Sequence, residues 1–231
     1  PVVQREEARA FSEVELMSAD PITVVVSEKG WIRAAKGHDI DPAGLSYKAG
    51  DGFKLEARGR SNQPAVLLDS TGRAYTIATH NLPSARGQGE PLTGRISPPS
   101  GAVFNGLLMG DSDWRYLLAS DGGYGFVTTL GNLQAKNRAG KAALTLPRGA
   151  RVLPPALVES DATWVAAASN EGRLLVFPLQ ELPVLARGKG NKIMSIPGAR
   201  VEKREEYVVG VIALRDDDAL VIHAGKRHLT L

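Results

Sequence analysis

Basic residues beside glycines recur along this chain, and the combination is suited to holding phosphate groups. The segments are Lys48-Ala49-Gly50, Arg86-Gly87-Gln88-Gly89, Arg138-Ala139-Gly140-Lys141 and Arg187-Gly188-Lys189-Gly190. Arginine offers a forked set of donors to a phosphate, and glycine, which lacks a Cβ, lets backbone amides approach one closely. Such segments could contact a nucleic-acid backbone without reading its sequence.

We therefore predict a track of cations that contacts duplex DNA. Its primary candidates are Lys48, Arg86, Arg138, Lys141, Arg187, Lys189 and Lys192. The secondary candidates are Arg33, Lys36, Arg58, Arg60, Lys136 and Arg173. For any one of them, a solvated surface charge is an equally good interpretation. Only their recurrence at equivalent points of the chain favours a common role.

The basic segments belong to a repeat that predicts the architecture. Five stretches each read as an apolar strand, a polar turn ending in glycine and a second strand. Their turn glycines are Gly30, Gly72, Gly123, Gly172 and Gly225, at spacings of 42, 51, 49 and 53 residues. This is the period of one propeller blade, and each glycine is expected to adopt a positive φ that folds the chain into a hairpin. Four turns begin with a residue whose side chain is expected to bond the backbone two residues on. These are Ser27, Asp69, Ser120 and Ser169.

Each basic segment falls at a set point of its unit. In the second, third and fourth units the arginine follows the turn glycine by 14, 15 and 15 residues. A further strand is expected after each basic segment, at residues 53–57, 92–96, 142–146 and 192–196. A hairpin with flanking strands cannot bury its apolar face alone, so the units must pack side by side, and radial packing gives an all-β, propeller-like disc.

About five blades are expected in a single domain spanning residues 1–231. After a leading segment at residues 1–20, the units are predicted at 21–61, 62–112, 113–161, 162–210 and 211–231. The fifth unit has no basic segment, so we expect residues 14–17 near the N-terminus to complete it. Residues 200–206 lack periodicity and are predicted to form a flexible connection between the fourth and fifth units.

Composition restricts the function only loosely. The 28 Lys and Arg residues exceed the 25 Asp and Glu residues by a net charge of +3, too little to identify a polyanionic partner. The absence of cysteine excludes disulfides and thiolate chemistry. No apolar run approaches the ~20 residues of a membrane-spanning helix, so we expect no membrane insertion and a cytoplasmic location.

No catalytic or metal centre is expected. The histidines His38, His80, His223 and His228 are dispersed, without the companion ligands of a zinc site. The run Asp216-Asp217-Asp218 lacks the alternating ligands of a calcium loop. Neither a P-loop nor a nucleophile elbow occurs. The aromatic residues that follow the turns, Trp31, Tyr75, Tyr124 and Phe126, are predicted to pack within the fold rather than stack on bases, as are Trp114 and Trp164.

Several segments of the chain together resemble the C-terminal domain of the A subunit of bacterial topoisomerase IV. The resemblance extends over essentially the whole chain. It is carried by SEKGWIRAAKGHDID at 27–41, LPSARGQGEPLTG at 82–94, GYGFV at 123–127 with NRAGKA at 137–142, and ARGKGNKI at 186–193. The related gyrase A domain has the heptapeptide Gln-Arg-Arg-Gly-Gly-Lys-Gly, and only degenerate versions occur here, at 84–89 and 185–190. Topoisomerase IV is therefore favoured over gyrase.

The resemblance implies a β-pinwheel, in which adjacent blades exchange strands and a basic rim binds and bends duplex DNA. It also implies that the domain has no catalytic residue or cofactor, because ATP and Mg²⁺ act elsewhere in the holoenzyme. The implied partners, at the nucleoid, are duplex DNA, the rest of the A subunit, and the ATPase B subunit. The alternative is a propeller scaffold for a protein such as a condensin, bound through acidic residues. Those considered are Asp111, Asp113, Asp161, Glu202, Glu205 and Glu206.

Overall fold

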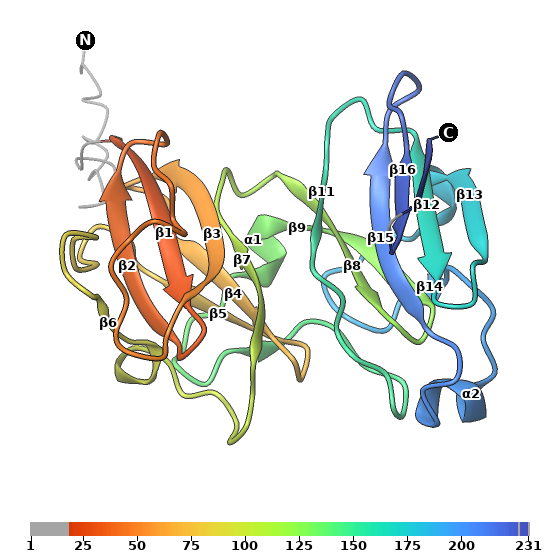
Figure 1. Cartoon of the computed structure of the whole chain (residues 1–231), viewed down its shortest axis with the longest axis horizontal. Helices are drawn as coiled ribbons and strands as arrows, with labels where there is room; N and C mark the ends of the chain where they lie inside the picture. The colour runs from red at the N-terminus through yellow and green to blue at the C-terminus, as the bar shows by residue number, and fades with distance from the viewer. Residues whose placement is uncertain (1–18, 226, 231) are drawn as a thin grey trace, which may run out of the picture.

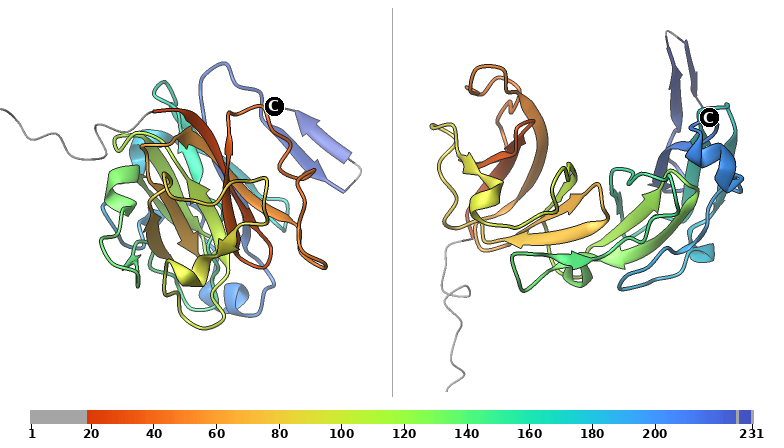
Figure 2. Two further views of the ribbon diagram at one scale, coloured as in Figure 1. Left: turned by 90° about the vertical axis from the view of Figure 1, so that its left-hand side faces the viewer. Right: turned by 90° about the horizontal axis from the view of Figure 1, so that it is seen from below.

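The chain folds into an arc of antiparallel sheets, each packed face to face with the next (Figure 1). This computed structural model describes residues 19–225 and 227–230. The expected completion of the last blade by residues 14–17, and most of the leading segment, lie outside the described residues. Viewed from below, the sheets follow one another along an open curve from the red to the blue end (Figure 2).

Three sheets have four strands each. Blade 1 has the order β3-β1-β2-β6, from strands Phe53–Arg60, Pro21–Ser27, Trp31–Lys36 and Glu90–Pro91. Blade 2 has the order β10-β5-β4-β7, from Lys141–Ala142, Arg73–Ile77, Ala65–Asp69 and Phe104–Leu108. Blade 3 has the order β11-β8-β9-β14, from Ala156–Val158, Arg115–Ser120, Tyr124–Thr129 and Asn191–Lys192. In each, one edge strand comes from the next unit along the chain, which is the strand exchange expected of a β-pinwheel.

The remaining elements are smaller. Blade 4 is three-stranded, in the order β13-β12-β15, from Leu174–Pro178, Trp164–Ser169 and Val208–Leu214. Strands β16 (Val221–Ala224) and β17 (Arg227–Thr230) pair only with each other among the described residues. Short helical turns lie between strands: η1 at Leu92–Gly94, α1 at Leu130–Leu133, η2 at Leu179–Glu181 and α2 at Gly198–Glu202.

The core is divided among the interfaces between blades. Strand β4 shows why, because all five of its residues are buried and its side chains alternate between two neighbours. Leu67 packs into the cluster shared with blade 1, whereas Val66 and Leu68 pack into the cluster shared with blade 3. A third cluster joins blades 3 and 4 through residues such as Val127 and Val165. Each hairpin is therefore stable only between its neighbours.

The turn chemistry read from the sequence is confirmed for the glycines. Their φ values are +77° at Gly30, +80° at Gly72, +84° at Gly123, +79° at Gly172 and +61° at Gly225. The side-chain bonds differ from the expectation: the Asp69 carboxylate accepts from Thr71 N two residues on, but Ser27 Oγ accepts from Trp31 N and Ser169 Oγ from Arg173 N, four residues on. In those turns the hydroxyl bridges the whole turn to the start of the second strand.

Two turn glycines also make room for the exchanged segment. A Cβ on Gly72 would overlap the carbonyl oxygen of Leu144, and one on Gly123 would overlap that of Met194. The residues after the exchanged strand are held there by hydrogen bonds, since Ala143 N and Leu144 N both donate to Gly72 O at 2.9 Å. The exchanged strand therefore ends there, and the chain turns away from the edge of the sheet.

This geometry corrects the strands predicted after the basic segments. Residues 53–57 lie in β3, as expected, but residues 92–96 begin with the helical turn η1. The strands expected at 142–146 and 192–196 are replaced by two-residue strands that begin one residue earlier, β10 and β14. Pairing ends so soon because the following amides turn to the hairpin glycine instead.

Residues 200–206 are not the flexible connection predicted from their charge. They form α2 and a turn, tied to the blades by paired charges. Glu206 is only 2% exposed and accepts from Arg173 at 2.7 Å and Arg200 at 2.6 Å. Arg204 donates to Asp121 Oδ2 at 2.7 Å and holds the positive φ of 59°. A buried carboxylate that accepts two guanidinium donors is strongly localised.

Replacing a turn glycine should therefore cost more where the exchanged segment passes. We expect Gly172→Ala, at φ +79° and with no atom within 4 Å of the added Cβ, to lower the free energy of unfolding by about 1–2 kcal/mol. Gly72→Ala, at φ +80°, should cost at least about 2 kcal/mol more, because Leu144 O must move. Urea unfolding of both variants measures this, and equal losses would contradict the proposed role of the close approach.

Candidate nucleic-acid interface

Three basic segments occupy equivalent places on successive blades. We call residues 86–89 corner 1, 138–141 corner 2 and 187–190 corner 3. Each precedes an exchanged strand that pairs with the preceding blade, and each contains a glycine with positive φ at or next to its end. A Cβ on Gly89, Gly140 or Gly190 would overlap a backbone carbonyl oxygen of that blade. The corner glycines therefore serve the contact between blades.

The backbone after each corner is bonded to the hairpin turn of the preceding blade. Leu92 N donates to Gly30 O at 2.9 Å, Ala143 N to Gly72 O at 2.9 Å and Ile193 N to Gly123 O at 2.7 Å. All three corners thus lie at the hairpin ends of the sheets. The turn between β1 and β2 lies at the lower edge of blade 1 in Figure 1.

Neighbouring corners are also linked to each other. Ser97 N, after corner 1, donates to Arg138 O at 2.7 Å, and the Arg138 guanidinium donates to Gly94 O at 2.7 Å. After corner 2, Thr145 N donates to Gly188 O at 2.8 Å while Gly188 N donates to Ala143 O at 2.9 Å. A continuous chain of backbone contacts therefore runs from corner 1 to corner 3.

The side chains of the corners point outward and are not neutralised. Arg86, Arg138, Arg187 and Lys189 are exposed, as is Lys192 just after corner 3, and Lys141 is half-buried. In the described part of the chain none of them forms an ion pair with a carboxylate, whereas the buried acids Glu206 and Asp121 each have an arginine partner. The unpaired cations leave positive potential along the hairpin ends.

The glycine amides themselves are used within the fold. Gly87 N donates to Ser84 O, Gly140 N to Asn137 O and Gly188 N to Ala143 O. The expectation that glycine brings backbone amides to phosphate is therefore wrong for these three residues. The donors that remain for a phosphate at the corners are the basic side chains.

Lys48 lies elsewhere than the other primary candidates. It is in the loop between β2 and β3, and this loop folds back on the hairpin turn of its own blade through the bond from Lys29 N to Asp51 Oδ1 at 2.9 Å. Its ammonium lies over the Trp31 ring, 3.2 Å from the centroid. Lys48 is thus at the same end of blade 1 as corner 1, although no strand exchange brings it there.

Two aromatic residues predicted to pack within the fold prove to support cations. The Lys189 ammonium lies 4.3 Å from the centroid of the half-buried Tyr124 ring. The Lys48 ammonium lies over the Trp31 ring in the same way, at 3.2 Å. Both aromatic residues directly follow a turn glycine, and that position was the feature of the sequence from which their contact with a lysine could have been predicted. By contrast, Tyr75 and Phe126 are fully buried, as predicted. Trp114 and Trp164 are 44% and 39% exposed, so they are surface residues rather than core.

Arg33 is wrongly placed among the DNA contacts. It is 2% exposed, and its guanidinium donates to Ser46 O at 2.8 Å and Gly87 O at 2.6 Å. The Tyr47 ring lies over it, 4.5 Å from Cζ to the centroid. Arg33 therefore holds corner 1 against blade 1 from beneath and cannot reach a phosphate in this arrangement.

The other secondary candidates divide into two groups. Arg173 is exposed, but its guanidinium is bonded to buried Glu206 and to Ser195 O at 3.0 Å, so it also serves the fold. Lys36, Lys136, Arg58 and Arg60 are exposed. Lys36 lines an open cleft beside Ser84 and Arg86, and Lys136 is two residues before corner 2. Arg58 is 3.9 Å from Glu56, a solvated pair of small energetic value.

The burial of Lys141 lowers its pKa below the usual lysine value, and the positive charge of Arg187 lowers the pKa further. Both effects disfavour the protonated amine. The bonds of Gly188 to Ala143 and Thr145 hold corner 3 beside corner 2, which agrees with the direction of this effect.

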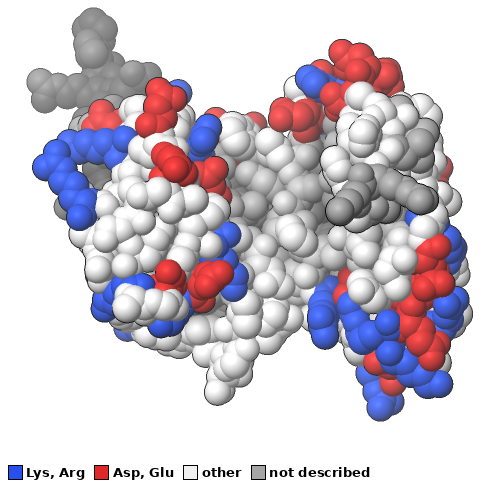
Figure 3. Space-filling model, in the orientation of Figure 1, with Lys and Arg blue, Asp and Glu red and all other residues white. Residues whose placement is uncertain are grey.

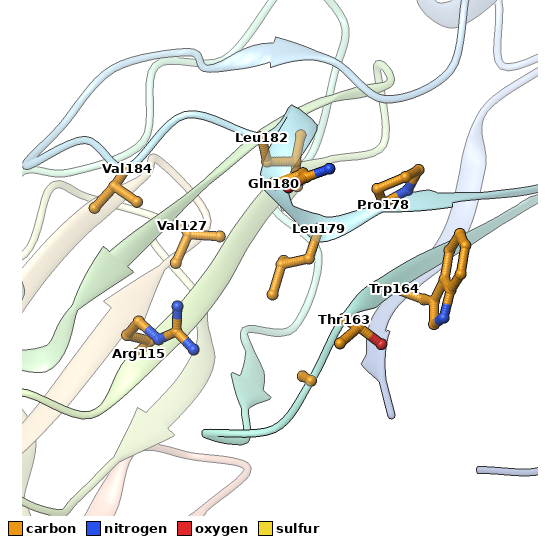
Figure 4. Close-up of a pocket in the computed structure, with 10 residues that line it drawn as sticks. Arg115, Val127, Thr163, Trp164, Pro178, Leu179, Gln180, Leu182 and Val184 are labelled. Carbon is orange, nitrogen blue, oxygen red and sulfur yellow. The ribbon is translucent and has the colours of Figure 1, made fainter. Parts of the chain in front are cut away.

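A different surface lies beside the interface of blades 3 and 4. A cleft of about 570 Å³ is lined by Arg115 and Val184 on one side and Trp164 on the other (Figure 4). The indole Nε1 of Trp164 donates to Asp216 Oδ1 at 2.7 Å. Figure 3 shows basic side chains mixed with acidic ones at the lower left and lower right of one face, an uncharged depression between the two halves, and mainly acidic side chains at the upper right.

Comparison with known proteins agrees with this architecture. The model of the family described as "DNA gyrase C-terminal domain, beta-propeller" matches residues 116–158 and 163–221. The A subunit of DNA topoisomerase 4 from Pseudomonas aeruginosa is 59% identical over 232 residues, and that from Escherichia coli is 50% identical over 231. Both alignments cover the whole of this chain and 31% of the relative, so the chain spans about a third of those proteins.

A solved structure decides the family. The E. coli ParC C-terminal domain superposes with a TM-score of 0.86 at 51% identity, over 92% of this chain and 86% of that one. The chain belongs to the C-terminal domains of the topoisomerase IV A subunit. The resemblance read from the sequence and the all-β pinwheel fold are thereby confirmed. A gyrase A C-terminal domain superposes with a TM-score of 0.60 at 14% identity, over 86% of this chain and 67% of that one, which shows a common fold only.

The described residues hold no cluster of metal ligands, since three or more potential ligands never come together there. Within the same residues, every helix is too short or too polar to cross a membrane.

The pKa of Lys141 should report on its distance from corner 3. We expect Arg187→Gln to raise the pKa of Lys141, because removing a nearby positive charge favours protonation, while burial keeps it below the usual lysine value. The ¹³C chemical shift of the Lys141 ε-methylene followed against pH measures this. Arg86→Gln, on corner 1, is the control and should leave the titration unchanged. If the pKa of Lys141 is unchanged by Arg187→Gln, the proposed nearness of Lys141 to Arg187 is contradicted.

Proposed function

We propose that this pinwheel domain binds duplex DNA along its three corners, without reading base sequence. The observation that carries the proposal is the row of exposed, unneutralised cations that the corner-to-corner contacts hold at the hairpin ends of the sheets. Duplex DNA presents a regular row of phosphates, and its binding to such a row releases condensed counterions. The contacts would be made by Arg86, Arg138, Lys141, Arg187 and Lys189, with Lys48, Lys192, Lys36 and Lys136 beside them.

The curvature of the arc supports bending of the bound duplex. Successive blades turn relative to one another, so the corners follow a curve (Figure 2). A straight duplex could reach only part of that curve. Bending it costs on the order of a few kcal/mol, which the additional phosphate contacts must offset.

In the whole enzyme, this domain would hold one DNA segment beside the cleavage core. It would thereby influence which second segment passes through the break, and hence decatenation and supercoil relaxation during chromosome segregation. Its partners, at the nucleoid in the cytoplasm, would be the rest of the A subunit, together with the ATPase B subunit. Catalysis, with ATP and Mg²⁺, would belong to those other parts, because the cations described at the corners have no convergent acid and base among them.

Charge reversal at a corner should weaken DNA binding, and the same reversal elsewhere should not. We expect Arg86→Glu to lower the affinity for a duplex of about 40 base pairs by about tenfold or more and to reduce the slope of log K against log salt by about 1. The control is Arg215→Glu, in the acidic segment before β16, where Arg215 pairs with Asp218 at 2.8 Å. Fluorescence anisotropy at several salt concentrations measures both. Absent or salt-insensitive binding by the unmodified chain would refute the proposed function.

A second candidate function is the binding of a protein such as a condensin. Of the acidic residues predicted for it, Glu206 is buried and bonded to two arginines, whereas the other five are exposed. The cleft between blades 3 and 4 supports it better. Val184 is 63% exposed and Trp164 39% exposed there, with Arg115 as the charged residue of the lining. Exposed aromatic and aliphatic residues around one arginine suit a protein interface better than a phosphate backbone.

The two functions can be separated by substitution. We expect Val184→Asp to reduce the affinity for purified condensin by about tenfold or more in calorimetric titration, because it puts a charge into the apolar cleft, while DNA affinity changes little. Val209→Asp is the matched control, since Val209 is 53% exposed on β15 but does not line the cleft. Equal effects of the two substitutions, or none, would rule out this cleft as the binding site.

A further inference from the structure

Corners 2 and 3 bring two cations together without a counter-charge. Lys141 opens β10 and pairs with Ala74 of blade 2, and corner 3 crosses the residues that follow it. The crossing is fixed on both sides of Gly188, whose N–H donates to Ala143 O and whose carbonyl accepts from Thr145 N. The backbone of Arg187 therefore cannot move away from Lys141 without breaking the contact between blades 2 and 3.

No acid in the described part of the chain relieves this pair. Neither Lys141 nor Arg187 has a carboxylate within ion-pair distance there, and Asp69, at the hairpin end of blade 2, is fully buried. The oxygens of Asp69 accept from Thr71, from Arg73 N and from Tyr75 Oη at 2.7 Å. A third cation, Arg73, lies under corner 2, where its guanidinium donates to Ala139 O at 2.8 Å.

Several other crowded charges of the molecule are paired. Arg173 and Arg200 share Glu206, and Arg204 pairs with Asp121. The crossing of corners 2 and 3 is different, because the bonds of Gly188 hold Arg187 beside the exchanged strand that the half-buried Lys141 begins, and neither cation has a carboxylate partner in the described part. Like charges held together in a partly desolvated position raise the free energy of the fold until an anion binds.

We propose that Lys141 and Arg187 together bind a single phosphate group at the joint between blades 2 and 3. This rests on the proposed DNA binding and specifies it: the two side chains share one phosphate of the duplex rather than contacting one each. The ammonium and the forked guanidinium offer enough donors to surround one tetrahedral oxyanion. Free inorganic phosphate has the same chemistry and should occupy the same joint.

The salt dependence of DNA binding distinguishes one shared phosphate from two. With either Lys141→Gln or Arg187→Gln, the other cation still neutralises the phosphate, so the slope of log K against log salt should change by less than about 0.5. The double variant should lose the contact, with a slope smaller by about 0.9 and an affinity loss greater than the product of the two single losses. The matched control is Lys141→Gln with Arg86→Gln, whose losses should simply multiply.

The shared site would be refuted if each single substitution reduced the slope of log K against log salt by a similar step and if the affinity losses of the two single variants simply multiplied in the double variant. Inorganic phosphate gives a readout that needs no DNA. Against chloride at equal ionic strength, it should raise Tm by on the order of 2 °C more in the unmodified chain than in the double variant. The double variant corrects for the general stabilisation of proteins by phosphate salts. An equal rise in both would refute the joint as an anion site, whereas a phosphate effect without DNA binding would refute only the proposed function.

Discussion

One backbone contact recurs through this molecule and holds its parts in place: the carbonyl of a hairpin glycine accepts amides from the next unit. Gly30, Gly72 and Gly123 each receive such a bond from the segment after an exchanged strand. At Gly72 and Gly123 the approach leaves no room for a Cβ. Because the contact joins units rather than strands within a unit, it fixes how each blade sits on the next. The segments that make this contact also contribute Leu92, Leu144 and Met194 to the three apolar clusters between blades.

The same contact explains why the basic side chains face solvent. At a corner, the backbone is occupied on its inner side by the preceding blade, through glycines such as Gly89 and Gly190 whose missing Cβ permits the approach. Most of the basic side chains beside those glycines are exposed, and Lys141 is half-buried. Cations at these positions therefore remain hydrated and unpaired in the described part of the chain, while an arginine placed on the inner side, such as Arg33, is drawn into holding the corner. Position relative to the corner, and not residue type, separates the exposed cations from the structural ones.

The structure also shows which features can be predicted from a single sequence and which cannot. Turn glycines, hairpins and the period of the blades are local patterns, and the structure confirms them at Gly72 and its equivalents. The strand expected at 92–96 failed because its first amide turns to the carbonyl of Gly30, far back in the chain, a contact that no local pattern encodes. The burial of Arg33 and the ion pair of Arg173 were missed for a related reason: their partners, Gly87 O and Glu206, lie 54 and 33 residues away in the chain. Residues 200–206 were predicted to be flexible because they are charged and lack periodicity, yet Arg200 and Arg204 are paired with buried acids. The contacts of Trp31 and Tyr124 with lysine ammonium groups could have been predicted, since both aromatic residues directly follow a turn glycine.

Strand exchange has a direction, and this sets how many corners a chain of such units can present. Each corner arises where a unit gives a strand back to the blade before it, so corners are counted by exchanges and not by hairpins. In the described residues, blades 1, 2 and 3 each receive a strand, whereas blade 4 receives none and remains three-stranded. Beyond blade 4, β16 and β17 pair only with each other within the described part, and the glycine and basic residue there, Gly225 and Arg227, belong to their own hairpin rather than to a segment before an exchanged strand. On the proposed function, the length of DNA held would be set by the contacts between blades, because the segments that join the sheets are also those that carry the cations.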